Sequence, residues 1–220
     1  LDGVEVDIGH ARQRCVLAAL LVEVNRPVPA DQLIERVWAD RPPHRARNAL
    51  SAYLSRLRHL LTAAPGVRIT RGPGGYVLAT EPLTVDLHRF RHLVAQARTA
   101  VGPADAAALY DQALALWRGE VFATFDTPWF DALRTSLDAE RLAATLDRND
   151  AALRAGRHGD LLAELTAIAR HHPLDERLAG QLMLAQARSG RQADALETYQ
   201  QVRRRLLDEL GADPGVGLRE

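Results

Sequence analysis

The sequence of 220 residues has no lysine, one cysteine and no long apolar run. Each of these scarcities limits the classes of protein to which the chain can belong. The lone Cys15 excludes an internal disulfide and fits a reducing cytoplasm, and its apolar helical surroundings favour a buried thiol over a nucleophile. Because no stretch of about 18 apolar residues occurs, no membrane-spanning segment is expected. All 28 residues of the lysine and arginine class are arginine, which indicates a GC-rich coding bias, so the choice of arginine at one position carries little information.

Motifs of catalysis and of nucleotide binding are missing as well. The sequence contains no Gly-x-Ser-x-Gly, no Walker loop and no dinucleotide-binding fingerprint, and the glycine-rich segment 71–75 is not followed by Gly-Lys-Ser/Thr. His88 and His92 are four residues apart, a spacing that could hold zinc, but neither a His-Glu-x-x-His motif nor a third ligand accompanies them. We therefore expect solvated histidines, no bound metal, no cofactor and no enzymatic activity.

A formal net charge of zero conceals a separation of charge along the chain. Residues 1–80 contain 11 arginines and 7 acidic residues, whereas residues 81–220 contain 17 and 21. Between Asp40 and Glu81 there is no carboxylate, yet seven arginines fall there. This basic region would attract a phosphate backbone, and the remainder would be repelled by it.

The first 80 residues show the order strand, helix, helix, connector, helix, hairpin. Hydrophobic periodicity, prolines and glycines place these elements at residues 1–9, 11–24, 31–39, 40–44, 45–61, and 67–70 with 76–79. This order is that of a winged helix-turn-helix, in which the third helix reads DNA and the hairpin is the wing.

The third predicted helix has two contrasting faces. Leu50, Leu54 and Leu57 recur at helical spacing, with Tyr53 and Leu61 beside them, and form an apolar back. Roughly opposite lie Arg47, Asn48, Ser51, Ser55 and Arg58. Such a helix can be buried on one side and enter a major groove on the other, although an ordinary solvated face would show the same pattern.

The charge changes sign across residues 81–86, which we predict to be a linker between a winged-helix domain (1–80) and a helical domain (87–220). Segments at 86–100, 103–118, 128–155, 175–189 and 192–210 are predicted helices. Ala155-Gly-Arg157 and Ser189-Gly-Arg191 are 34 residues apart, the period of tetratricopeptide repeats. The predicted fold class is mainly α: a winged helix-turn-helix followed by an all-α, tetratricopeptide-like array.

Several of these segments together resemble the Streptomyces antibiotic regulatory protein (SARP) family. They are residues 12–21, 33–38 with Pro42 and Pro43, 46–58, 74–78, Asp86 with Phe90, 190–196 with Tyr199, and 210–215. Members combine an OmpR-like winged helix with a bacterial transcriptional activation domain. The resemblance covers essentially the whole chain, although relatives have more strand residues before the position of Leu1, so the first sheet looks trimmed.

The resemblance implies roles for particular residues. Base contacts are expected from Arg47, Asn48, Ser51, Ser55 and Arg58. Phosphate contacts are expected from Arg45, Arg56, Arg68, Arg71 and Tyr76. The connector that corresponds to the polymerase-facing loop of OmpR-like activators consists of Asp40, Arg41, Pro42, Pro43 and His44.

The resemblance also implies partners and a place in the cell. A member of this family is expected to bind direct repeats in double-stranded DNA near the promoter −35 element as a head-to-tail dimer. It recruits RNA polymerase, including the sigma subunit, to secondary-metabolite (antibiotic) genes, and acts in the cytoplasm at the nucleoid. Two alternatives stay open: a tetratricopeptide protein-interaction module without DNA preference, and the amino-terminal regulatory part of a larger signalling NTPase.

Overall fold

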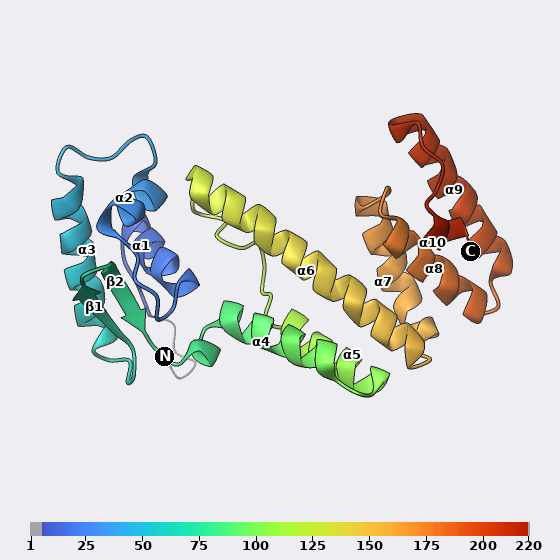
Figure 1. The fold of residues 1–220 in the computed structure, drawn as a ribbon, viewed down its shortest axis with the longest axis horizontal. Helices are drawn as coiled ribbons and strands as arrows, with labels where there is room; N and C mark the ends of the chain where they lie inside the picture. The colour runs from blue at the N-terminus through green and yellow to red at the C-terminus, as the bar shows by residue number, and fades with distance from the viewer. Residues whose placement is uncertain (1–5, 220) are drawn as a thin grey trace. The chain divides into compact units, whose positions relative to one another are not determined.

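The computed structural model describes residues 6–219, which divide into two compact units (Figure 1). The first comprises Leu1–His92 and Leu116–Glu140, and the second comprises Leu93–Ala115 and Arg141–Glu220. The chain crosses between the units at three places: inside α4 (Asp86–Thr99), at residues 115–116, and inside α6 (Pro128–Arg154). None of these crossings is at residues 81–86. The linker and the domain limits therefore remain predictions from the sequence. The compact units of the folded chain have other limits.

The first unit contains the predicted winged helix-turn-helix. Its elements are α1 (Ala11–Val22), α2 (Ala30–Trp38), α3 (Ala46–Leu61), β1 (Arg68–Gly72) and β2 (Gly75–Ala79). The helices and the hairpin are confirmed, with ends shifted by a few residues. The predicted strand at 1–9 lies partly outside the described residues, and residues 6–9 are not in a strand.

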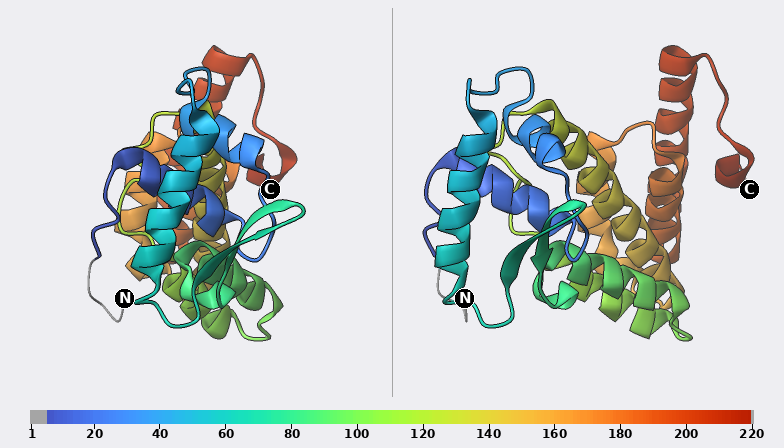
Figure 2. Two further views of the ribbon diagram at one scale, coloured as in Figure 1. Left: turned by 90° about the vertical axis from the view of Figure 1, so that its left-hand side faces the viewer. Right: turned by 60° about the vertical axis from the view of Figure 1, so that its left-hand side comes forward.

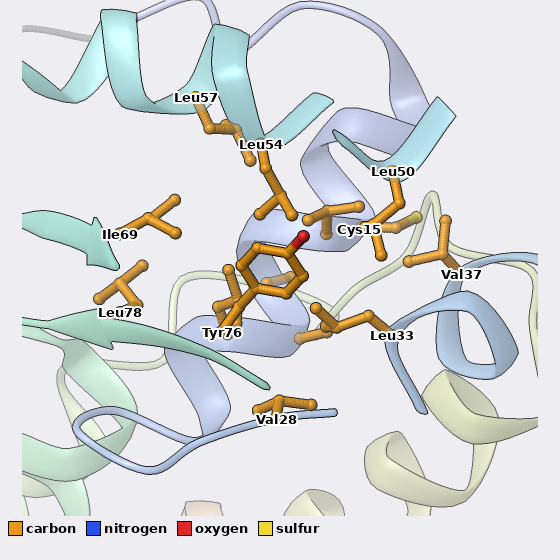
Figure 3. Packing of buried hydrophobic residues seen from close by; sticks show 14 of the residues in the cluster. Cys15, Val28, Leu33, Val37, Leu50, Leu54, Leu57, Ile69, Tyr76 and Leu78 are labelled. Atoms are coloured by element: carbon orange, nitrogen blue, oxygen red, sulfur yellow. The ribbon is translucent and has the colours of Figure 1, made fainter. Parts of the chain in front are cut away.

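The core of this unit forms where the apolar faces of three helices and the hairpin meet. Figure 3 shows Cys15 of α1, Leu33 of α2, Leu54 of α3 and Leu78 of β2 converging on one cluster. Burial raises the pKa of the Cys15 thiol, and Arg12 partly offsets that effect. Cys15 is 2% exposed, so the expectation of a buried thiol is confirmed.

The hairpin is held against the connector between α1 and α2. Its strands pair antiparallel from Arg68 with Ala79 to Gly72 with Gly75. Val28 and Tyr76 exchange two backbone hydrogen bonds, of 2.8 and 2.9 Å. A Cβ atom on Gly75 would lie 2.1 Å from the Val28 carbonyl oxygen, and the φ of Gly75 is 125°, so this position requires glycine. The wing is thus fixed in place at its base.

Residues from the second half of the sequence complete the first core. Phe130, near the start of α6, is fully buried in the same cluster, where the Phe122 ring contacts it edge-on and the Phe125 ring contacts it at a tilt. The Thr127 hydroxyl donates to the Arg36 carbonyl at 2.8 Å. The helix predicted at 103–118 ends earlier than expected, since α5 spans Pro103–Leu114. The loop that follows α5 contains Phe122 and Phe125.

The second unit also contains α7 (His158–His171), α8 (Glu176–Arg188), α9 (Gln192–Leu210) and the short α10 (Val216–Arg219). Helices α7 and α9 begin 34 residues apart, which confirms the predicted period. Gly156 (φ 83°) and Gly190 (φ 77°) end the preceding helices with the same pair of backbone hydrogen bonds, a Schellman motif. Within residues 6–219, no helix combines the length and apolarity needed to cross a membrane.

Candidate nucleic-acid interface

Helix α3 has the two faces that its sequence predicted. Leu50, Leu54 and Leu57 are buried in the core of the first unit. Its opposite face carries four exposed polar side chains, those of Arg47, Asn48, Ser51 and Ser55. The helix lies beside the hairpin in each view (Figures 1 and 2), and this polar face and the wing belong to the same compact unit.

The first turn of α3 is open to an anion. Arg45 occupies the N-cap position without a side-chain cap, and the first turn contains no acidic residue. The first N–H groups of a helix have no partner inside the helix and carry a partial positive charge. Together with the exposed side chains of Arg45 and Arg47, they form an arrangement that suits a phosphate group.

Arg47 forms an ion pair with Asp31, in the first turn of α2. One guanidinium nitrogen donates to both carboxylate oxygens, at 2.7 and 2.9 Å. The side chains are 73% and 75% exposed, respectively. Ion pairs at such exposure contribute about 0–1 kcal/mol, so Arg47 can leave Asp31 for another partner. This contact could not be predicted from the sequence, because the two residues come together only through the packing of α2 on α3.

Arg58 is placed differently from the other predicted base-reading residues. It is half-buried, and its Nε donates to the Ile69 carbonyl oxygen of β1 at 2.9 Å. Its guanidinium carbon lies 5.9 Å from the centre of the Tyr76 ring. In this structure Arg58 connects α3 to the hairpin, and base reading by this side chain would require these contacts to break.

Tyr76 does not fit the predicted phosphate contact. Its side chain is 8% exposed and belongs to the core. Figure 3 shows the ring pointing into the cluster of buried residues. Side chains alternate between the two faces along β2, which turns Tyr76 and Leu78 inward. The Tyr76 ring therefore packs under the hairpin as part of the core. We leave it out of the candidate interface.

Five arginines between residues 41 and 71 have no carboxylate partner among the described residues. Within residues 6–219, no carboxylate is at ion-pair distance from Arg41, Arg45, Arg56, Arg68 or Arg71. All five side chains are exposed. Many arginines of the second unit are paired instead, and ion pairs with carboxylates are formed there by Arg98, Arg148, Arg157, Arg177, Arg191 and Arg203.

The positive character of this surface is local. Counted by compact unit, the first contains 15 arginines and 14 acidic residues, and the second contains 13 and 14. The separation of charge between residues 1–80 and 81–220 therefore almost disappears in the folded units. Two features distinguish the α3 region: the stretch from Arg41 to Thr80 has no carboxylate, and in the described part of the chain Arg47 is the one arginine of that stretch with an ion-pair partner.

The predicted polymerase-facing connector is an exposed loop. Asp40, Arg41, Pro42, Pro43 and His44 are all exposed and precede α3 without regular secondary structure. Ala39, with φ 49°, ends α2, and its N–H donates to the Glu35 carbonyl oxygen. Two prolines restrict the backbone of the loop to few conformations.

The histidines do not assemble a metal site. The Nε2 atom of His88 lies 3.0 Å from the Leu21 carbonyl oxygen, a contact that joins α4 to α1 within the first unit. His92 is exposed. Across the described residues, no group of three or more histidine, cysteine, aspartate or glutamate side chains has the arrangement of a metal site.

Comparisons with known proteins agree with this architecture. Residues 6–78 match the family "Transcriptional regulatory protein, C terminal", and residues 85–220 match "Bacterial transcriptional activator domain". The regulatory protein AfsR of Streptomyces coelicolor is 41% identical over the whole chain, which spans 22% of AfsR. The regulatory protein DnrI of Streptomyces peucetius is 33% identical over 99% of the chain, which spans 84% of DnrI.

A solved structure of Mycobacterium tuberculosis EmbR, in complex with a low-affinity phosphopeptide, superimposes with a TM-score of 0.94 at 36% identity. The match covers 99% of this chain and 59% of the EmbR chain. Fold, domain families and relatives agree. The chain therefore belongs to the Streptomyces antibiotic regulatory protein family of transcriptional regulators, with an OmpR-like winged helix and a bacterial transcriptional activator domain.

Proposed function

We propose that the protein is a sequence-specific transcriptional activator that binds double-stranded DNA through α3 and the hairpin. One observation carries the proposal: an exposed polar face on α3 is surrounded by arginines that have no carboxylate partner in the described residues. Exposed guanidinium groups without partners bind phosphate at no cost in broken ion pairs. A major groove accommodates one helix, so the polar face of α3 would meet the base edges.

The contacts divide into two classes with different consequences. Arg47, Asn48, Ser51 and Ser55 project from the exposed face of α3 and are assigned to base edges, where a bidentate contact is worth about 1–3 kcal/mol of discrimination. Contacts with the phosphates of the DNA backbone are assigned to Arg45, Arg56, Arg68 and Arg71. Phosphate contacts orient the protein and dominate the salt dependence of affinity. Arg58 holds the wing in register with α3.

Activation would follow from contacts with RNA polymerase. The exposed loop from Asp40 to His44 lies directly before α3 and is assigned to polymerase, including its sigma subunit. Family membership supports binding to direct repeats near the −35 element by a head-to-tail pair. The relatives AfsR and DnrI, both named regulatory proteins of Streptomyces, support control of antibiotic genes.

Binding-site selection from a random duplex library tests the proposal. The protein is expected to enrich a motif repeated in the same orientation about one helical turn apart. The matched variant Asn48→Ala is expected to lose the enrichment at some positions of each repeat. Recovery of no motif by the unaltered protein would contradict sequence-specific binding.

The loop can be tested separately from DNA recognition. Arg41→Ala removes an exposed charge from the loop without touching the polar face of α3. We expect unchanged affinity for the selected repeats and a several-fold lower transcript yield in a reconstituted transcription reaction. Arg56→Ala serves as the comparison, because it is expected to lower both quantities together. If Arg41→Ala lowers promoter binding in proportion to transcript yield, the loop does not face polymerase.

A further inference from the structure

The second unit contains a groove that the proposed DNA-binding function does not use. A hollow of about 730 Å³ is lined by residues of α6, α8 and α10. A second hollow of about 370 Å³ adjoins it and shares Asp150, Arg154 and Arg177 with the first. Together they form a continuous depression along neighbouring helices, large enough for several side chains of a peptide.

Each helix contributes one face to this groove. On α6 the lining residues include Asp147, Asp150 and Arg154, and on α8 they include Leu184 and Arg188. Spacings of three and four residues place side chains on the same face of a helix. The larger hollow is therefore built from helical residues, whereas the loop 100–102 before α5 lines part of the smaller one.

The acidic residues of the groove are already occupied. The Arg177 guanidinium bonds to the carboxylates of Asp147 and Asp150, and these hydrogen bonds raise its pKa although burial acts in the opposite direction. The Glu176 carboxylate accepts a hydrogen bond from the Gly215 N–H at 2.6 Å. Arg98 and the Tyr110 hydroxyl also donate to Asp147.

Two arginines of the groove, Arg154 and Arg188, do not form ion pairs with its carboxylates. Arg154 donates from Nε to the Asp150 backbone carbonyl, and Arg188 donates from NH1 to the Leu153 carbonyl at 2.8 Å. In the described part of the chain neither has a carboxylate partner, and both are exposed. Leu184, one helical turn before Arg188, is 40% exposed. The groove thus offers two guanidinium groups and an apolar contact.

We propose that this groove binds an acidic peptide segment of a partner protein. Carboxylates of the peptide would pair with Arg154 and Arg188, and an apolar side chain between them would pack on Leu184. Hydrogen bonds between a guanidinium group and a carboxylate are charge-assisted and stronger than those between neutral groups. Both arginines have N–H donors that no described residue accepts from.

Phage display of random nine-residue peptides on the immobilised full chain tests this proposal. Sequences that combine aspartate or glutamate with leucine-like residues are expected to be enriched. The enriched peptide, made with a fluorescent label, is expected to bind at least about tenfold more weakly to the double variant Arg154→Gln/Arg188→Gln. Leu184→Ser is expected to weaken binding about threefold or more.

Arg204→Gln is the matched control, because Arg204 is exposed on α9 and its Nε donates to the carbonyl of Gln200 on its own helix, as that of Arg154 does to Asp150. It should leave peptide affinity unchanged. All variants should retain the helical circular dichroism and thermal midpoint of the unaltered protein and its affinity for DNA. Enrichment without an acidic bias, or equal peptide affinity of the double variant and the control, would overturn the proposal.

Discussion

Arg47 and Asp31 illustrate how a single exposed ion pair can adjust DNA binding. Their contact joins α3 to α2 on the surface assigned to DNA, and both side chains are about three-quarters exposed. In the proposed complex, the Asp31 carboxylate would compete with DNA for Arg47 and would repel the DNA phosphates. Asp31 would therefore lower the affinity for DNA of any sequence.

We expect Asp31→Asn to raise affinity for both cognate and random duplex a few-fold at low salt, and less at high salt, because exposed charges are screened. Fluorescence anisotropy at two salt concentrations measures the effect. Asp160→Asn is the matched control, since Asp160 is also 75% exposed and pairs with an arginine, but in the second unit. Unchanged or weaker binding by Asp31→Asn would contradict the assigned surface.

Cys15 gives the stability of the first unit a dependence on pH. Burial raises the thiol pKa, so the folded state holds the proton more tightly than the unfolded state does. The resulting stabilisation is fully present below the ordinary thiol pKa of about 8.5 and is lost as pH rises through the folded value. The difference in unfolding free energy between the unaltered protein and Cys15→Ala is expected to shrink between neutral and alkaline pH. Urea titrations at several pH values measure it, and a constant difference would contradict the assignment.

At the scale of elements, much of the architecture could be predicted from local patterns. The leucine periodicity of α3, the glycines after α6 and α8, and the proline and glycine punctuation of the hairpin each depend on nearby residues. Long-range contacts were not predictable. The hydrogen bond from Arg58 to Ile69 and the burial of Tyr76 arise only when the hairpin folds back on α3.

The base of the wing depends on Gly75. We expect Gly75→Ala to destabilise the protein by more than about 2 kcal/mol, because the new methyl group would meet the Val28 carbonyl oxygen and the backbone φ is unfavourable for alanine. Gly72→Ala is the control across the same hairpin, since no atom lies within 4 Å of its added Cβ, and should cost less than about 1 kcal/mol. Denaturant unfolding distinguishes them. Equal losses would mean that the connector does not clamp the wing.

At the scale of the whole molecule, sequence position and folded unit do not coincide. Residues 116–140 belong to the sequence region matched by the activator domain, yet Phe130 is buried in the core beside α1, α2 and α3. Aromatic residues near the start of a long helix gave no indication of which core they would enter. An isolated fragment ending near residue 80 would expose this part of the core, and we expect it to be less stable than a chain that includes residues 116–140.

Parallel titrations of Asn48→Ala and Arg71→Ala test most directly whether α3 reads bases and whether the hairpin contacts the DNA backbone. On a selected repeat and a scrambled duplex, Asn48→Ala should lose about 1–3 kcal/mol on the repeat and little on the scrambled sequence. Arg71→Ala should weaken both nearly equally and lower the slope of log affinity against log salt by about one. Equal losses on both duplexes for Asn48→Ala, together with an unchanged salt slope for Arg71→Ala, would contradict the account.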